Sequence, residues 1–416
     1  MKRLRVFTAF SGYDSQCLAI NRLRETHGVD YELVGWSEIG KDAIKAHNAL
    51  FPDAADKNYG DISKIDWAQV PDFDLFTYSS PCQDFSAAGL QRGGEEGSGT
   101  RSSLLWECRR AIIAKRPLFL LLENVKALTS DKFLPLLQKW CAELSNYGYI
   151  NHCAVLNAKD YGVPQNRERV FVFSIRKDVT GASAFRFPRP FPLKRKLRNI
   201  LEEDVDEKYY LKDEIVERFL RKTAENKEKG LGFAFNPPTA DGVSYTLRCQ
   251  CYGGPEDARF INLLGREDGF GQPAVIEKDM KQDNKIKQVG NISDSPHNPL
   301  WTRVYSPEGN APTLNAMMGT GGNNEPLMLQ SQPRYRIRKL TERECFRLMG
   351  VDDKDIDTIQ ASGVSRSAQY KMAGNSIVVD VLYHIFRQAF TNDLDTSGAV
   401  VETIKVDVQQ LKLFEL

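Results

Sequence analysis

The chain has 416 residues, of which 41% are hydrophobic and 27% charged, so it is long enough for two globular domains with a sizeable core. Its net charge of +1 gives no overall positive field for a polyanionic partner and leaves room only for a local basic cleft. The start, Met1–Phe7, lacks a secretion signal, and no apolar run approaches membrane-spanning length, so we expect a cytoplasmic protein without membrane contact. The 8 cysteines show no framework spacing, and Cys249 with Cys251 is a poor metal signature, which predicts reduced thiols and no metal site.

A strand, a glycine-bearing turn and a helix open the chain. The apolar residues Val6–Phe10 predict a short buried strand, which breaks at Ser11–Asp14, and a helix follows from about Ser15. A second strand is predicted over Tyr31–Trp36. Glu38 follows its end, where nucleotide-binding folds place the acid that holds a ribose. This order of elements is typical of the start of a nucleotide-binding βαβ unit.

Strands and helices keep alternating up to about Arg176, and a loop acid, Asp61, is expected near the same edge as Glu38. The further segments, in chain order, are a helix over Lys41–Leu50, a strand over Phe73–Tyr78, a helix over Leu104–Lys115, a strand over Leu118–Leu122, a helix over Phe133–Leu144, and strands over Tyr149–Asn157 and Val170–Ile175. This alternation predicts an α/β fold with a doubly wound, mostly parallel sheet.

The segment around Cys82 is the centre of the functional interpretation. Pro81 prevents the preceding strand from continuing, so Cys82 lies just past a carboxyl end, where open α/β sheets bind their ligands. A glycine-rich segment, Ser86–Thr100, follows it. This arrangement is typical of a nucleophile with a lid, whereas a lone unpaired cysteine is more often a small buried core residue. The decisive companion is Glu123, which ends another predicted strand and stands level with Cys82 if the two strands are parallel.

The character of the chain changes after residue 184. Phe185–Pro192 is a proline-spaced linker, and turns and short strands dominate from there to about Arg334, with one helix near Glu214–Glu225. Regular helix then returns, because Thr341 opens a segment with capping-box spacing and Gly374–Ser376 precedes an apolar helix. We predict three parts, 1–184, 185–334 and 335–416, and expect the helix after Gly374 to return to the first part.

The ordered motifs resemble those of the DNA (cytosine-5)-methyltransferases of bacterial or phage type. The matching residues, in chain order, are Phe10-Ser11-Gly12, Glu38, Asp61, Pro81-Cys82-Gln83, Glu123-Asn124-Val125, Gln165-Asn166-Arg167-Glu168-Arg169, Arg343–Gly350 and Gly374-Asn375-Ser376. The resemblance implies an S-adenosylmethionine-dependent methyltransferase fold in which 1–184 carries the catalytic and cofactor site. It also implies that 185–334 is a smaller, irregular, β-rich target-recognition domain.

The resemblance implies catalytic roles for Cys82, Glu123, Arg167 and Arg169. The thiolate of Cys82 would add to carbon 6 of a cytosine flipped out of the duplex, and methylation would follow at carbon 5. Glu123, with its pKa raised by burial, would assist at ring nitrogen 3. The two arginines would polarise the carbonyl oxygen of the base, although a surface charge pair with Glu168 stays open for Arg167.

The implied cofactor is S-adenosyl-L-methionine and the implied partner is double-stranded DNA. The cofactor contacts would be Phe10, Ser11, Gly12, Glu38, Asp61, Ile62, Pro81, Asn375 and Ser376. The candidate DNA contacts are Gln83, Ser86, Arg92, Gln165, Arg248, Arg259 and Arg303. We expect a monomer, and the sequence leaves open whether a cognate restriction endonuclease accompanies it.

One departure from the family's pattern lies in the cofactor turn, where Asp14 and Ser15 stand in place of further glycines. Aspartate tolerates a left-handed backbone, so the turn can survive, and its acid is expected near the methionine end of the cofactor. Three alternatives stay open at this point. They are a tRNA cytosine-5 methyltransferase, a catalytically silent DNA-binding relative, and a cysteine hydrolase, which ranks last because none of the 5 histidines sits in a motif suited to partner the cysteine.

Overall fold

A six-stranded sheet is the centre of the computed structural model, which describes residues 3–80, 98, 101–230, 237–247, 260–262, 288–291, 303–305, 327–328, 337–391 and 400–404. In spatial order the strands are β2 (Tyr31–Ser37), β1 (Leu4–Ala9), β3 (Leu75–Tyr78), β4 (Phe119–Val125), β6 (Glu168–Arg176) and β5 (Tyr149–Asn157). The first four pair in parallel, and β6 is antiparallel to both of its neighbours. The predicted α/β fold with a mostly parallel sheet is therefore confirmed.

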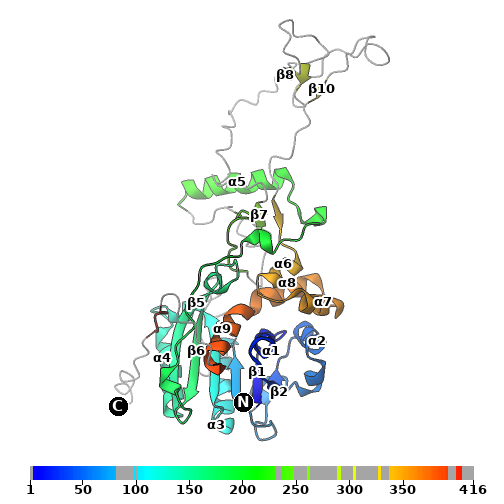
Figure 1. Ribbon diagram of the computed structural model, residues 1–416. Helices are drawn as coiled ribbons and strands as arrows, with labels where there is room; N and C mark the ends of the chain where they lie inside the picture. The colour runs from blue at the N-terminus through cyan, green and yellow to red at the C-terminus, as the bar shows by residue number, and fades with distance from the viewer. Residues whose placement is uncertain are drawn as a thin grey trace.

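Helices cover both faces of this sheet because successive strand residues point to opposite sides. Val6 and Leu121 belong to a core cluster that includes α1 (Ser15–His27) and α9 (Val379–Phe390). Their neighbours Phe7 and Leu120 belong to a second cluster with α3 (Leu105–Lys115) and α4 (Leu134–Asn146). Figure 1 shows α9, late in the sequence, beside α1 at the sheet. The sheet is thus buried on both sides, as a doubly wound fold requires.

The predicted element boundaries agree closely with the structure in the first part of the chain. Helix α2 spans Lys41–Leu50, as predicted, and β6 begins two residues before the predicted Val170. Short 3₁₀ turns join the elements at Pro52–Lys57, Ile62–Lys64, Arg101–Leu104, Lys126–Thr129, Ala158–Tyr161, Ala182–Ala184, Leu197–Asn199 and Glu207–Tyr209. None of the helices in the described part of the chain is long and apolar enough to cross a membrane.

The segment after residue 184 contains a helix and several short strands. They are α5 (Asp213–Glu228), β7 (Phe260–Asn262), β8 (Gln288–Asn291), β9 (Arg303–Tyr305) and β10 (Leu327–Met328). Strand β9 lies between β8 and β10, whereas β7 pairs antiparallel with β11 (Ile337–Lys339). The chain from β11 onward therefore contacts both the middle segment and, through α9, the central sheet. The three-part division at residues 184 and 334 stays a prediction.

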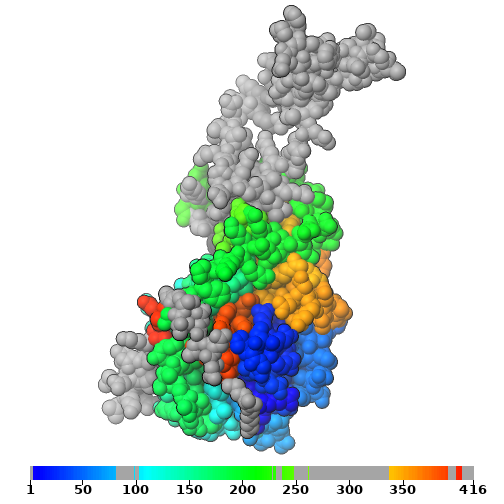
Figure 2. Space-filling model, in the orientation of Figure 1, coloured from blue at the N-terminus to red at the C-terminus, as the bar shows by residue number. Residues whose placement is uncertain are grey.

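Three further helices precede α9: α6 (Glu342–Arg347), α7 (Asp353–Ala361) and α8 (Arg366–Asn375). The predicted capping box at Thr341 is present, because its hydroxyl accepts the Glu344 N–H while the Glu344 carboxylate accepts the Thr341 N–H at 2.8 Å. Figure 2 shows these helices, in orange, packed directly against the blue amino-terminal elements. They bring the last two predicted motifs next to the first.

Candidate active site and cofactor turn

The carboxyl ends of β3 and β4 lie side by side, because Tyr78 pairs with Leu122 in a parallel register. Ser80, which is 3% exposed, is tied to β4 through the Asn124 side chain, whose Nδ2 donates to the Ser80 carbonyl at 3.3 Å. Asn124 directly follows Glu123, so the chain leading to the predicted nucleophile is held beside the predicted acid. The predicted site residues that lie outside the described residues in this part of the chain are Pro81, Cys82, Gln83, Ser86 and Arg92.

Glu123 and Arg169 form a nearly buried ion pair across the antiparallel strands β4 and β6. Arg169 Nε lies 3.2 Å from Glu123 Oε1, and the two side chains are 16% and 9% exposed. Burial raises the pKa of the Glu123 carboxyl above its usual range, and the positive charges of Arg169 and Arg167 oppose this rise. A raised pKa for Glu123 is also what the sequence led us to expect. The pair can present a protonated carboxyl and a fixed cation to the same small volume.

Arg167 and Gln165 are placed differently from their predicted roles. The Arg167 guanidinium, 2% exposed, donates to the backbone carbonyls of Leu247, Gly374 and Ser376 at 2.8–3.0 Å. Neither contact to a base carbonyl nor a surface pair with Glu168 fits this arrangement. Gln165 is 0% exposed, and its side-chain amide is bonded to the protein backbone. The assignment of Gln165 as a DNA contact is therefore wrong, because a fully buried side chain does not reach a DNA groove.

The predicted cofactor turn follows β1 and is held against the end of β2. Phe10, Gly12 and Asp14 all have positive φ, at 54°, 60° and 68°, so the chain reverses sharply between strand and helix. The Gly12 N–H donates to Glu38 at 3.0 Å, and Ser37 Oγ donates to the Gly60 carbonyl at 2.6 Å. These bonds place the loops after β1 and β2 and the loop that carries Asp61 at one edge of the sheet.

The residues at this edge fit a nucleoside-containing cofactor. A Cβ built on Gly12 would meet no atom within 4 Å, which leaves open space directly above the turn. The Glu38 carboxylate faces Gly12 and also accepts the N–H groups of Ile39 and Gly40. Asp61 is half-buried, and hydrogen bonds from Ser63 hold the pKa of its carboxyl below the usual range. Two ionisable acids therefore stand at adjacent loop tips, where ribose hydroxyls and a base amino group can donate to them.

The turn also meets the last predicted motif. Tyr13 is 1% exposed, and its hydroxyl shares a hydrogen bond of 2.6 Å with the Ser376 hydroxyl, while Asn375 is exposed beside it. The Tyr13 ring also packs edge-on against Phe346. Tyr13 was not singled out in the sequence, because its partners lie more than 300 residues away. Its position between Gly12 and Asp14 was the only signal that could have found it.

Three residues at or near the predicted cofactor site face inward. Asp14 is fully buried, accepts bonds from Thr8 Oγ1 at 2.7 Å and Cys17 N–H at 3.0 Å, and lies 3.4 Å from His47 Nε2. The Asp14 carboxylate therefore faces the protein interior, and its left-handed backbone is confirmed. Its nearness to the methionine end of the cofactor stays a prediction. Ser11, 4% exposed, and Ile62, 2% exposed, are packed below the site, so direct cofactor contact by their side chains is not supported.

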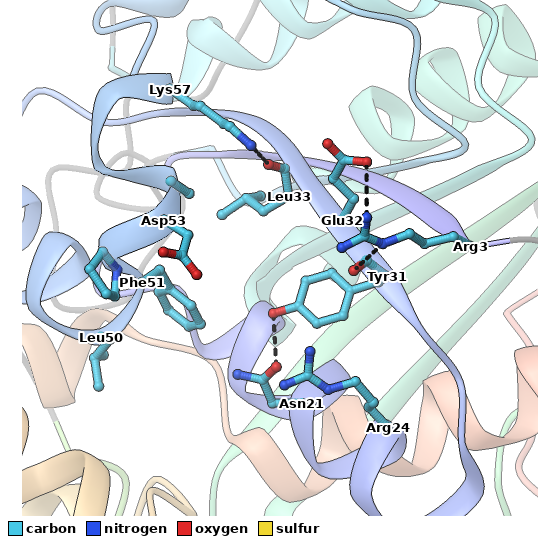
Figure 3. A pocket seen from close by; sticks show the side chains of 12 residues that line it. Arg3, Asn21, Arg24, Tyr31, Glu32, Leu33, Leu50, Phe51, Asp53 and Lys57 are labelled. Atoms are coloured by element: carbon cyan, nitrogen blue, oxygen red, sulfur yellow. Dashed lines mark hydrogen bonds and ion pairs between the residues drawn. The ribbon is translucent and has the colours of Figure 1, made fainter.

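A separate pocket of about 290 Å³ lies at the opposite end of β2. Figure 3 shows its lining, in which Tyr31 and Glu32 come from the first residues of β2. Tyr31 donates its hydroxyl to Asn21, and Arg3 donates to the Tyr31 carbonyl. Because Glu38 follows the other end of this strand, the pocket is distinct from the cofactor turn.

Of the remaining predicted DNA contacts, Arg248 and Arg259 lie outside the described residues. Arg303 begins β9, where it is paired with Asn291 of β8. These three assignments stay predictions. Among the described residues, no group of three or more His, Cys, Asp or Glu side chains could hold a metal ion.

The order of the strands in the sheet and the helices on its two faces define an α/β fold that is shared with methyltransferases of known structure. Solved structures with this fold include the Dnmt2 methyltransferase of S. pombe, with a TM-score of 0.57 at 17% identity over 92% of this chain and 97% of that one. The Entamoeba histolytica methyltransferase EhMeth gives a TM-score of 0.60 at 15% identity, over 94% and 98%.

The chain belongs to the C-5 cytosine-specific DNA methylase family, whose sequence model matches residues 4–391. It is 31% identical to the type II methyltransferase M2.ScrFI of Lactococcus lactis subsp. cremoris, over 93% of this chain and 99% of the relative. It is 30% identical to the orphan methyltransferase M.SPRI of Bacillus phage SPR, over 93% and 98%. The predicted family is confirmed, and the chain is a DNA (cytosine-5)-methyltransferase.

Proposed function

We propose that this chain methylates carbon 5 of cytosine at a specific site in double-stranded DNA, with S-adenosyl-L-methionine as the donor. The observation that carries the proposal is the buried Glu123–Arg169 pair, held beside the strand end that leads to Cys82. When bound, the cofactor supplies an electrophilic methyl group. Glu38, Asp61 and the Gly12 turn would hold it, because the two acids stand at adjacent loop tips and the space above Gly12 is open.

The chemistry assigned to the protein begins with Cys82. Its thiolate adds to carbon 6, which opens the 5,6 double bond and makes carbon 5 nucleophilic. The negative charge that develops at ring nitrogen 3 is met by a proton from Glu123, whose raised pKa favours the protonated carboxyl. Once carbon 5 carries the methyl group, the proton on carbon 5 is lost to solvent, the 5,6 double bond re-forms and the thiolate leaves. The proton on ring nitrogen 3 returns to Glu123, which restores the acid.

Arg169 has two tasks in this proposal. It orients the Glu123 carboxyl through the 3.2 Å contact, and its cation lies where the cytosine carbonyl oxygen gains charge. The target base must leave the duplex to reach this buried pair, at a cost of a few kcal/mol that pocket contacts offset. The pair is buried before DNA arrives, so its electrostatic effect needs little rearrangement.

A covalent trap tests the roles of Cys82 and Glu123. Duplex DNA with 5-fluorocytosine at the target should give a denaturation-resistant adduct, because fluorine does not leave as a proton does. Cys82→Ser should abolish the adduct, and an adduct retained by this variant would overturn the assignment. Glu123→Gln should lower the methylation rate by roughly two to four decades while calorimetry shows unchanged cofactor binding. Transfer of tritiated methyl to tRNA and not to DNA would refute the choice of substrate.

Target choice is assigned to residues 185–334. This segment lies between the motifs that carry the chemistry, and its described residues include short strands such as β8 and β9 besides the helix α5. Replacing it with the matching segment of a relative that has another target should move methylation to that target, as read by bisulfite sequencing. A chimaera that keeps the original target would contradict the assignment.

The protein is proposed to act as a monomer on DNA. Light scattering during size-exclusion chromatography measures the mass directly, with 47.1 kDa expected for one chain. The relatives carry both the type II and the orphan name, so a partner endonuclease is tested by challenging DNA methylated by this chain with candidate nucleases.

A further inference from the structure

The side chains of Gln165 and Arg167 form hydrogen bonds with both polar backbone groups of one residue, Leu247. The Leu247 N–H donates to Gln165 Oε1 at 3.1 Å, and Arg167 Nη1 donates to the Leu247 carbonyl at 2.9 Å. The two gripping side chains are 0% and 2% exposed. Buried amide and guanidinium groups need such partners, because leaving one unsatisfied is costly.

The whole segment 244–247 runs alongside 164–167. The Ser244 N–H donates to the Pro164 carbonyl at 2.9 Å, the Asn166 N–H donates to the Ser244 carbonyl at 2.8 Å, and Thr246 Oγ1 donates to the Asn166 carbonyl at 2.6 Å. Backbone and side-chain bonds therefore alternate along the contact. We call residues 244–247 the docked arm, and it is the described stretch immediately before Arg248.

Each gripping side chain also holds a second part of the chain. Gln165 Nε2 donates to the Leu348 carbonyl at 2.7 Å, next to α6. Arg167 Nη2 donates to the carbonyls of Gly374 and Ser376, and the Ser376 hydroxyl is the one bonded to Tyr13 of the cofactor turn. Gln165 thus joins the arm to the end of α6, and Arg167 joins it to the residues around Ser376.

We propose that Gln165 and Arg167 are positioning residues that clamp the docked arm, which is part of the recognition segment 185–334, against the strand that carries Arg169. The proposal rests on the function proposed above. The clamp sets the spacing between the part that selects DNA and the Glu123–Arg169 pair, and neither clamp residue touches the base. Arg167 is linked to the cofactor turn through Ser376, whereas Gln165 is linked to Leu348, so the two side chains have separable effects.

Four variants of the full-length chain test the clamp. Gln165→Met keeps about the volume of the side chain but removes its hydrogen bonds to Leu247, Leu348 and Met349. Arg167→Met removes the guanidinium, and Arg167→Lys keeps a cation that can hold one carbonyl at a time. Asn166→Ala is the matched control, because Asn166 lies between the clamp residues, its side chain is exposed, and among the described residues that side chain accepts a hydrogen bond from Asn157 alone.

Steady-state methylation and cofactor calorimetry give the main readouts. Gln165→Met should raise KM for target DNA by about tenfold or more, the effect of losing bonds to a buried group, with kcat and the cofactor Kd within about twofold. Arg167→Met should raise both KM for DNA and the cofactor Kd, and Arg167→Lys should restore part of each. Asn166→Ala should change none of them. A Gln165→Met enzyme with unchanged KM for DNA, or with a loss in kcat alone, would overturn the proposal.

Hydrogen exchange at the Leu247 amide separates the clamp from the enzyme's chemistry. The amide is protected by Gln165 in the intact protein, so Gln165→Met should speed its exchange, whereas Asn166→Ala should not. If the wild-type chain methylates no DNA, the proposed function fails while this exchange still tests the clamp. Unchanged protection in a folded Gln165→Met protein would refute the clamp itself.

Discussion

The ion pair between Arg338 and Glu344 predicts a large and unequal effect of two similar substitutions. Arg338 of β11 is 1% exposed and Glu344 of α6 is 0% exposed. The guanidinium donates to both carboxylate oxygens, each at 2.7 Å. Removing one partner leaves a charge in the core, which costs about 3–5 kcal/mol of unfolding free energy.

The remaining hydrogen bonds decide where each variant falls in that range. In Arg338→Met the carboxylate of Glu344 keeps the backbone N–H groups of Thr341 and Glu202, both at 2.8 Å, so we expect a loss of about 3 kcal/mol. In Glu344→Met the guanidinium keeps only the Lys339 carbonyl at 3.1 Å among the bonds described for it, and two N–H groups lose their acceptor. We expect a loss of about 5 kcal/mol. The double variant should lose less than the two single losses added together.

Urea unfolding followed by circular dichroism measures these differences. Lys354→Met is the control, because Lys354 and Glu25 form an ion pair at 3.3 Å whose side chains are 65% and 57% exposed. Such a surface pair contributes about 0–1 kcal/mol. If Arg338→Met costs no more than Lys354→Met, or if Glu344→Met is the milder core variant, the reasoning from burial and residual bonds is refuted.

Two further predictions concern buried acids. Because burial raises the pKa of Glu123, its protonated form contributes stability at acid pH, below the unfolded pKa, and this contribution is lost as pH rises through the folded pKa. Glu123→Gln should therefore gain thermal stability relative to the wild type as pH rises, and a difference independent of pH would contradict the burial argument. Asp14→Asn should lower the unfolding free energy by about 1–3 kcal/mol, because it disturbs the bond to Thr8 and the contact with His47. The control is Asp42→Asn on the exposed face of α2, which should change the unfolding free energy by less than about 0.5 kcal/mol. Equal effects would show that the buried network contributes nothing.

Local features of the sequence were sufficient for the elements and for part of the site. Helix α2 and the capping box of α6 were predicted because their signals lie within a few neighbouring residues. Glu123 was predicted to stand level with Cys82, because parallel strands present their carboxyl ends at one edge of a sheet. The parallel register of Tyr78 with Leu122 agrees for the ends of the two strands. The raised pKa of Glu123 followed from the same inference of burial.

Only the tertiary structure decided what Gln165, Arg167 and Asp14 do. Arg167 binds carbonyls 80 and 207 residues away in the sequence, and Gln165 binds one 183 residues away. Residue type alone indicates that a guanidinium or an amide will find acceptors, but it does not indicate whether they belong to a base, to DNA or to the protein backbone. For Asp14 the sequence sufficed for the left-handed turn, which depends on one residue's own sterics. The direction of its carboxylate depends on Thr8 and on His47 of α2, which come together only when the sheet and its helices pack.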